Sequence, residues 1–156
     1  MTTSDTLAAT PWAVGDELPA ISRRMTRERM RWYADALLGT SAPEPTAMIA
    51  EANVHTSDEF ARGEGLRGII SDGMISTNWI SSVLIAQFGR SYLQGGSLQT
   101  KFIRPIFEDQ VITARAVIRG VTVAGGEYEL ELEVWCEDET GQKCTVGSAS
   151  VSVAQT

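Results

Sequence analysis

Apolar residues recur at helical spacing within residues 26–39, and a second, shorter helical segment is indicated after Ser57. Thr26 can cap the amino end of the first helix and Gly39 can end it. The apolar residues that carry this period are Met30, Tyr33, Ala34, Leu37 and Leu38. Ser57 can likewise cap one or two helical turns over residues 58–62. The pattern therefore predicts one ordinary helix and one short helix.

A longer helix is predicted from Met74 onward, with Asp72 or Ser71 as its amino-terminal cap. Its apolar residues spread over a broad arc of the helix surface instead of one narrow stripe. They are Ile75, Trp79, Ile80, Val83, Leu84 and Phe88. Such an arc is typical of a helix that is mostly buried against a sheet.

The period changes to two after Gly89, which predicts β-strands. The expected strands cover residues 98–103, 111–118, 127–136 and 143–153. The third is the clearest, because leucine and valine alternate with glutamate along it. No helix separates the four strands, so we expect an antiparallel sheet with one wet face, and the long helix against its inner face. The fold class is α+β.

Composition narrows the class of protein. The 156 residues are 43% hydrophobic and 21% charged, as expected for one domain over 1–156, with residues 1–20 as an amino-terminal arm. The net charge of −7 argues against a nucleic-acid partner and against binding to anionic lipid. A local arginine cluster is interpreted as a solvated helix face, with a phosphate contact as the alternative; it comprises Arg23, Arg24, Arg27, Arg29 and Arg31.

Cysteine usage and hydropathy bear on location and on metal binding. Cys136 and Cys144 flank a predicted turn, and we expect two reduced, packed thiols there. The chain has no CxxC pair and no His/Cys cluster, so we expect no zinc site and no metal. No stretch is apolar enough for a membrane span, and the amino terminus does not resemble a secretory signal. We therefore expect a cytoplasmic protein.

The richest segment for chemistry is 53–74, which holds the only histidine, His55, and ends where the long helix begins. An imidazole can transfer protons near neutral pH. Glycine at a helix amino terminus, here Gly73, leaves a bare N–H that can stabilise a developing oxyanion. A glycine in a first helical turn costs stability, so it needs a reason, either tight packing or this close approach. The pair suits chemistry on a thioester carbonyl.

This segment, Asn53-Val-His55-Thr-Ser-Asp58-Glu-Phe60-Ala61-Arg62 and later Asp72-Gly73-Met74, resembles the MaoC-like family, which includes (R)-specific enoyl-CoA hydratases. The family motif reads Asp-x-Asn-Pro-(Ile/Leu)-His-x-Asp, then a Phe/Tyr-Ala pair, then His-Gly-Met. Residues 95–109 are similar to the family's Phe-x-x-Pro-Val-x-x-Gly-Asp strand. The resemblance covers about residues 20–153. It implies a hot-dog fold, in which an antiparallel β-sheet wraps a long central helix.

The resemblance also implies site residues. His55 matches the catalytic histidine and Gly73 the oxyanion glycine, while Asn53 and Met74 fall in the substrate-binding positions. The motif's proline is missing. Its catalytic aspartate falls on Ala50 when counted from His55 and on Glu51 when counted from Asn53, and its second histidine is replaced by Asp72. The candidate acid/base set is therefore His55 with Glu51 or Asp72; for Asp72 the alternative role is a helix cap.

Three functions remain open from the sequence. The first is a hydratase or dehydratase of an acyl thioester carried by CoA or an acyl carrier protein, without a cofactor. The second is addition of another nucleophile, an amine or an internal hydroxyl, to an unsaturated thioester, with a thioesterase as a further variant. The third is a non-catalytic acyl-binding subunit. An exposed sheet edge makes a homodimer or higher homo-oligomer the expected assembly in each case.

Overall fold

The computed structural model describes residues 11–39 and 52–155 of the chain. Its elements in chain order are β1 (Ile21–Arg24), α1 (Arg27–Gly39), α2 (Asp58–Gly63), α3 (Gly73–Phe88), α4 (Arg90–Gly95), β2 (Ser97–Phe102), β3 (Val111–Ala124), β4 (Glu127–Glu137) and β5 (Lys143–Ala154). Residues 1–10 of the predicted amino-terminal arm lie outside the described residues, as does Glu51.

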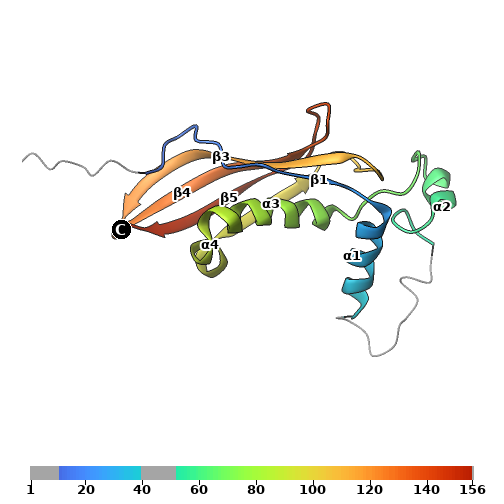
Figure 1. Cartoon of the computed structure of the whole chain (residues 1–156), viewed down its shortest axis with the longest axis horizontal. Coiled ribbons are helices and arrows are strands. Elements are labelled where there is room, and N and C mark those ends of the chain that lie inside the picture. Colours follow the sequence, from blue (N-terminus) through green and yellow to red (C-terminus); the bar gives the residue numbers. More distant parts are fainter. Residues whose placement is uncertain (1–10, 40–51, 156) are drawn as a thin grey trace, which may run out of the picture.

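The strands form one antiparallel sheet in the order β1-β3-β4-β5-β2. α3 lies along one face of this sheet, and α1 and α2 lie at one end of the molecule, beyond the amino end of α3 (Figure 1). The α+β prediction, with a long helix against an antiparallel sheet, is confirmed. The prediction of four strands was incomplete, because β1 pairs with β3 as a fifth strand. With only four residues, β1 is too short to show a clear period.

The predicted amino-terminal caps of α2 and α3 are confirmed. Asp72, not Ser71, caps α3, since its carboxylate accepts a hydrogen bond from the Met74 N–H at 2.8 Å. Ser57 accepts from the Phe60 N–H and caps α2. The sequence assigned residues 90–95 to no element, and they form α4, a single short helix that packs against α3 and β5.

The core fills the space between α3 and the inner face of the sheet. Ile80, Val83 and Leu84 on α3 are fully buried, and the leucines of β4 alternate with exposed glutamates as predicted. Trp79, predicted as a core residue, is also buried. A polar contact joins the two layers, because the hydroxyls of Ser76 and Thr145 lie 2.7 Å apart and both side chains are buried. This contact anchors the first turn of α3 to β5.

The two thiols are buried and unbridged, as predicted. Burial raises the pKa of Cys144 to about 11 and that of Cys136 further still. Both thiols therefore stay protonated near neutral pH and are unreactive. Within 11–39 and 52–155, no helix combines the length and the hydropathy that crossing a membrane requires.

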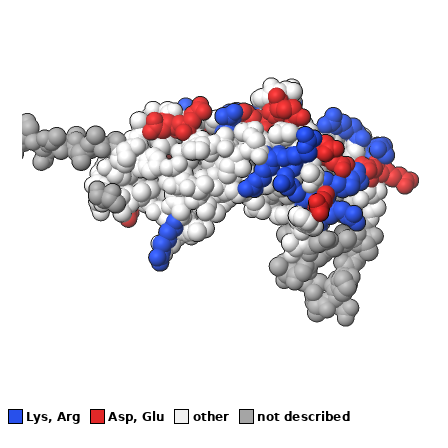
Figure 2. Space-filling view, viewed as in Figure 1, with Lys and Arg blue, Asp and Glu red and all other residues white. Residues whose placement is uncertain are grey.

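Charged side chains are unevenly spread over the surface. Figure 2 shows Lys and Arg gathered toward the end that holds α1 and α2, while uncharged residues cover much of the rest of this face. On β3, β4 and β5, Arg119 and Lys143 both pair with Glu133. The prediction that the arginine cluster forms one solvated helix face was wrong. Arg23 and Arg24 lie on β1, and Arg27 on α1 forms ion pairs with two other segments.

A substitution at Gly147 on β5 tests how closely the backbone of β2 packs against β5. A β-carbon at this position would lie 2.0 Å from the Gln99 carbonyl oxygen of β2, which is backbone and cannot swing away. We expect Gly147→Ala to lower the free energy of unfolding by about 2 kcal/mol, measured by urea denaturation. The neighbouring Ser148→Ala, at an exposed position, is the control. Equal stability of the two variants would contradict this packing.

Candidate active site at the amino end of α3

A short extended segment, Ile69 to Asp72, leads into α3 and lies between two loops. The Ile70 N–H donates to the Val54 carbonyl at 3.0 Å, and the Ser71 N–H donates to the Ile106 carbonyl at 2.8 Å. The loop that carries His55 and the loop that follows β2 are therefore fixed on opposite sides of the same segment. This arrangement brings residues far apart in the sequence to the amino terminus of α3.

His55 is oriented by hydrogen bonds at its backbone and at its ring. Its N–H donates to Asn53 Oδ1 at 2.8 Å, and its Nδ1 lies 2.9 Å from the Ile70 carbonyl oxygen. A carbonyl can only accept, so Nδ1 carries the proton and Nε2 of the neutral ring keeps its lone pair. The imidazole is thus held in the tautomer that a general base acting through Nε2 requires.

His55 lines a pocket of about 610 Å³ at the amino end of α3, here called the α3 pocket. Ser71, Asp72 and Gly73 line it from the start of α3, and Phe102 to Ile106 line it from the end of β2 and the loop that follows. His55, Asp72 and Gly73, three of the predicted site residues, are therefore brought together. Asn53 contacts the backbone of His55 rather than the pocket, and the side chain of Met74 is 44% exposed.

Gly73 is the first residue of α3, where the helix dipole concentrates positive charge. Within the described part of the chain its N–H has no acceptor, because the Asp72 cap binds the next N–H, that of Met74. The space of its missing side chain is filled: a β-carbon here would lie 2.6 Å from the ring of Phe102. Packing against Phe102 therefore explains why residue 73 is a glycine. Its N–H, which has no acceptor in the described part of the chain, can in addition bind an anion.

Two carboxylates, Asp72 and Glu51, are candidates for the acid/base partner of His55. Asp72 lines the α3 pocket, but one of its carboxylate oxygens already accepts the Met74 N–H as the helix cap. Burial raises the pKa of Tyr33 on α1, and the negative charge of Asp72 raises it further. Glu51, the other predicted partner, lies outside the described residues.

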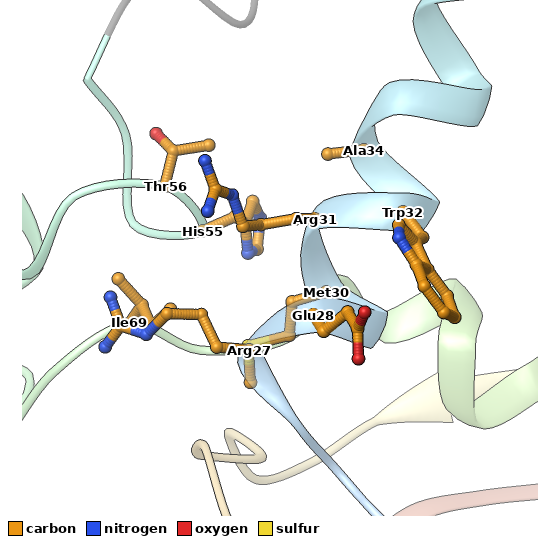
Figure 3. A pocket seen from close by; sticks show the side chains of 9 residues that line it. All are labelled: Arg27, Glu28, Met30, Arg31, Trp32, Ala34, His55, Thr56 and Ile69. Atoms are coloured by element: carbon orange, nitrogen blue, oxygen red, sulfur yellow. The ribbon is translucent and has the colours of Figure 1, made fainter.

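A second pocket of about 830 Å³, here called the α1 pocket, also reaches His55. It lies between α1 and the loop of His55 and Thr56, and the Arg31 side chain extends from α1 toward that loop (Figure 3). Glu28 on α1 is a further carboxylate on its wall. The sequence analysis missed this pocket, because nothing in the local pattern places α1 next to His55.

Arg27 ties together the three segments that surround the site. Its guanidinium binds Glu108, after β2, at 2.6 Å and Asp58, at the start of α2, at 2.9 Å. Asp58 also accepts the Ile69 N–H at 3.0 Å. The Ile69 N–H and then Arg27 lower the pKa of Asp58, Arg27 lowers that of Glu108, and these bonds raise the pKa of Arg27 itself.

The Arg27 ion pairs predict a pH-dependent stability. In the folded protein the pKa values of Asp58 and Glu108 lie below their ordinary values of 3.8 and 4.5. The two carboxylates therefore stabilise the fold fully when the pH is above those ordinary values. That stability is lost as the pH falls below them toward the lowered values. We expect Arg27→Met to reduce the free energy of unfolding more at pH 7 than at pH 3, measured by urea denaturation at both. Arg31→Met is the control on the same helix; an Arg27→Met effect that does not change with pH would contradict the ion pairing.

The contact between Gly73 and the Phe102 ring predicts that substitutions at the two positions have coupled effects on the free energy of unfolding. Gly73→Ala places a methyl group against the ring, so we expect it to cost about 1–3 kcal/mol in the wild type and little in a Phe102→Ala background. A double-mutant cycle of thermal or urea unfolding measures the coupling. Gly63→Ala is the control, since no atom lies within 4 Å of its β-carbon position. An equal cost in both backgrounds would show that the ring does not pack there.

Comparison with known proteins shows a shared fold at low sequence identity. No protein-family model and no curated protein matches the chain. Among solved structures, the chain is similar to an (R)-hydratase from A. caviae involved in PHA biosynthesis, at 20% identity and a TM-score of 0.68, over 92% of this chain and 98% of that one.

Two further structures give the same result. A MaoC-like dehydratase from Rhodospirillum rubrum is 16% identical with a TM-score of 0.69, over 93% and 94% of the two chains. The HadBC (3R-hydroxyacyl-ACP dehydratase) complex from Mycobacterium tuberculosis is 16% identical with a TM-score of 0.64, over 89% and 96%. The resemblance predicted from residues 53–74 is thus confirmed at the level of the fold: this chain has the hot-dog fold of the MaoC-like dehydratases and (R)-hydratases.

Proposed function

We propose that the chain is a hydratase or dehydratase that interconverts an α,β-unsaturated acyl thioester and its 3-hydroxy form. One observation carries this proposal: His55 lines the same pocket as Gly73, whose N–H has no acceptor among the described residues. Similarity of fold to (R)-hydratases and to a 3R-hydroxyacyl-ACP dehydratase supports the reaction class. The thioester is carried by CoA or by an acyl carrier protein, and the reaction needs no cofactor.

In the hydration direction, His55 Nε2 takes a proton from water while the water oxygen bonds to C3. The C2–C3 π electrons move toward C1, and the thioester oxygen becomes an enolate oxyanion. The Gly73 N–H, at the positive end of α3, donates to that oxygen, a type of contact typically worth about 10²–10³ in rate. The proton that His55 took from water then passes to C2, directly or through the neighbouring carboxylate. This step completes the 3-hydroxyacyl thioester and restores the neutral imidazole. The reverse sequence eliminates water.

A carboxylate beside His55 completes the catalytic set. We assign this role to Asp72 or Glu51, which holds the water or exchanges protons with it. Asp72 fits through its place in the α3 pocket. Asn53 supports the loop of His55, and Met74 lies next to the acyl group on the first turn of α3.

Addition of a nucleophile other than water is a second candidate function. The α1 pocket, about 830 Å³ in volume, adjoins the same imidazole and has room for much more than one water molecule. An amine held there would lose its proton to His55 and bond to C3. Supplying amines to the unsaturated thioester separates this candidate from the first.

We also propose that the protein works in the cytoplasm as a homodimer or higher homo-oligomer. β2 is at the edge of the sheet, and Phe102 and the following Ile103 are 49% and 46% exposed there. An unpaired strand edge with exposed apolar side chains favours pairing with a second chain. The same residues border the α3 pocket, so a second copy would also cover the site.

The hydration of crotonyl-CoA tests the proposed function. Loss of the conjugated thioester absorbance is expected with the wild type, and a fall in kcat/KM of about 10²-fold or more with His55→Ala. His55→Asn is the sharper variant, because its amide N–H can still donate to the Ile70 carbonyl although the base is gone. We expect it to keep the thermal stability and lose the activity.

Other outcomes of this assay distinguish the alternatives. Consumption only when an amine is added would favour the second candidate. Tight binding of crotonyl-CoA without turnover would favour a non-catalytic acyl-binding subunit. Full activity in both His55 variants would contradict the assignment of the general base.

A further inference from the structure

The hydroxyl of Ser71 is buried and has no hydrogen-bond partner in the part of the chain that the structure describes. Its side chain is 5% exposed, and within the described residues Ser71 Oγ is the one buried side-chain oxygen or nitrogen without a partner. Nearby Ser76 is just as buried, but its hydroxyl donates to the Gly73 carbonyl and contacts Thr145. A buried hydroxyl without a partner costs about 1–3 kcal/mol, so its presence calls for an explanation.

The position of Ser71 supplies one. It lines the α3 pocket together with His55 and Gly73. Its own N–H is used in the bond to the Ile106 carbonyl, which fixes the residue at the pocket wall. Two residues further on, the Gly73 N–H also has no acceptor in the described part of the chain. Two unused donors, two residues apart, therefore lie at the amino terminus of a 16-residue helix, where a negative charge is favoured.

We propose that, when an acyl thioester binds, rotation about the Cα–Cβ bond of Ser71 turns its buried hydroxyl toward the α3 pocket. The hydroxyl then donates to the thioester carbonyl oxygen and, with the Gly73 N–H, forms a two-donor oxyanion site. This inference rests on the proposed function and adds a catalytic residue to it. When water adds to C3, the electron pair displaced from the C2–C3 bond ends on the thioester oxygen, which then accepts both hydrogen bonds. The pair returns toward C2 when that carbon is protonated, and Ser71 keeps its own proton throughout.

The thioester oxygen fits these donors better than the attacking water does. The water must lie within reach of His55 Nε2 to give up its proton. The oxygen that gains negative charge instead benefits most from the helix terminus, and an oxyanion accepts two donors readily. Ser71 and Gly73 flank Asp72 in the sequence, so a single oxygen at this terminus is the natural ligand for both.

Ser71→Ala tests the inference through a split between activity and stability. The hydroxyl has no hydrogen-bond partner within 11–39 and 52–155, so its removal should leave the melting temperature unchanged or raise it. In contrast, kcat/KM for crotonyl-CoA should fall about 10²-fold. Ser82→Ala is the matched control on α3, because that hydroxyl bonds to the Asn78 carbonyl outside the pocket. A fall in activity that is matched by a fall in stability, or no fall in activity, would overturn the inference.

A readout without turnover separates this inference from the proposed function. Butyryl-CoA labelled with ¹³C at the carbonyl cannot be hydrated, and hydrogen bonds to its oxygen lower the carbonyl stretching frequency. We expect a clear infrared shift on binding to the wild type and to Ser82→Ala, and a smaller shift on binding to Ser71→Ala. The same shift in all three proteins overturns the role of Ser71 while leaving the hydratase proposal intact. Absence of butyryl-CoA binding to the wild type overturns both.

Discussion

Hydrogen bonds at Ile70 and Ser71 hold the candidate site together. The Ile70 carbonyl and N–H bind the His55 ring and the Val54 carbonyl, and the Ser71 N–H binds the Ile106 carbonyl. These bonds join two loops to the segment that leads into α3. Without them, the imidazole would have no fixed position relative to the helix terminus. The chemistry proposed here depends on that fixed position more than on any single side chain.

The surrounding structure reinforces this segment from two directions. α3 is buried against the sheet, and the contact between Ser76 and Thr145 fixes its first turn. On the outer side, the Arg27 guanidinium joins Glu108 to Asp58, and Asp58 binds the Ile69 N–H. A rigid helix terminus and a rigid loop can then place a donor and a base on either side of one ligand, which is what electrostatic preorganisation requires.

The sequence predicted those elements whose side chains repeat over many residues. α3 and β4 were found because burial imposes a period on long segments, and Asp72 as a cap followed from its local chemistry. β1 was missed because four residues are too few for a period. α4 was missed because it follows Gly89, which offers no side-chain cap, whereas Ser57 marked the equally short α2. The approach of His55 to Gly73 came from a family resemblance. The α1 pocket, the contact of Arg27 with Glu108 81 positions away, and the unpaired hydroxyl of Ser71 depend on tertiary contacts that leave no local signal.

A crystal structure with butyryl-CoA bound tests most directly whether the imidazole and the helix terminus act on one thioester. The account predicts the thioester oxygen within hydrogen-bond distance, about 2.7–3.2 Å, of the Gly73 nitrogen, with the β-carbon of the acyl group beside the His55 ring. An acyl group held only in the α1 pocket, with the Gly73 N–H still unused, would contradict it.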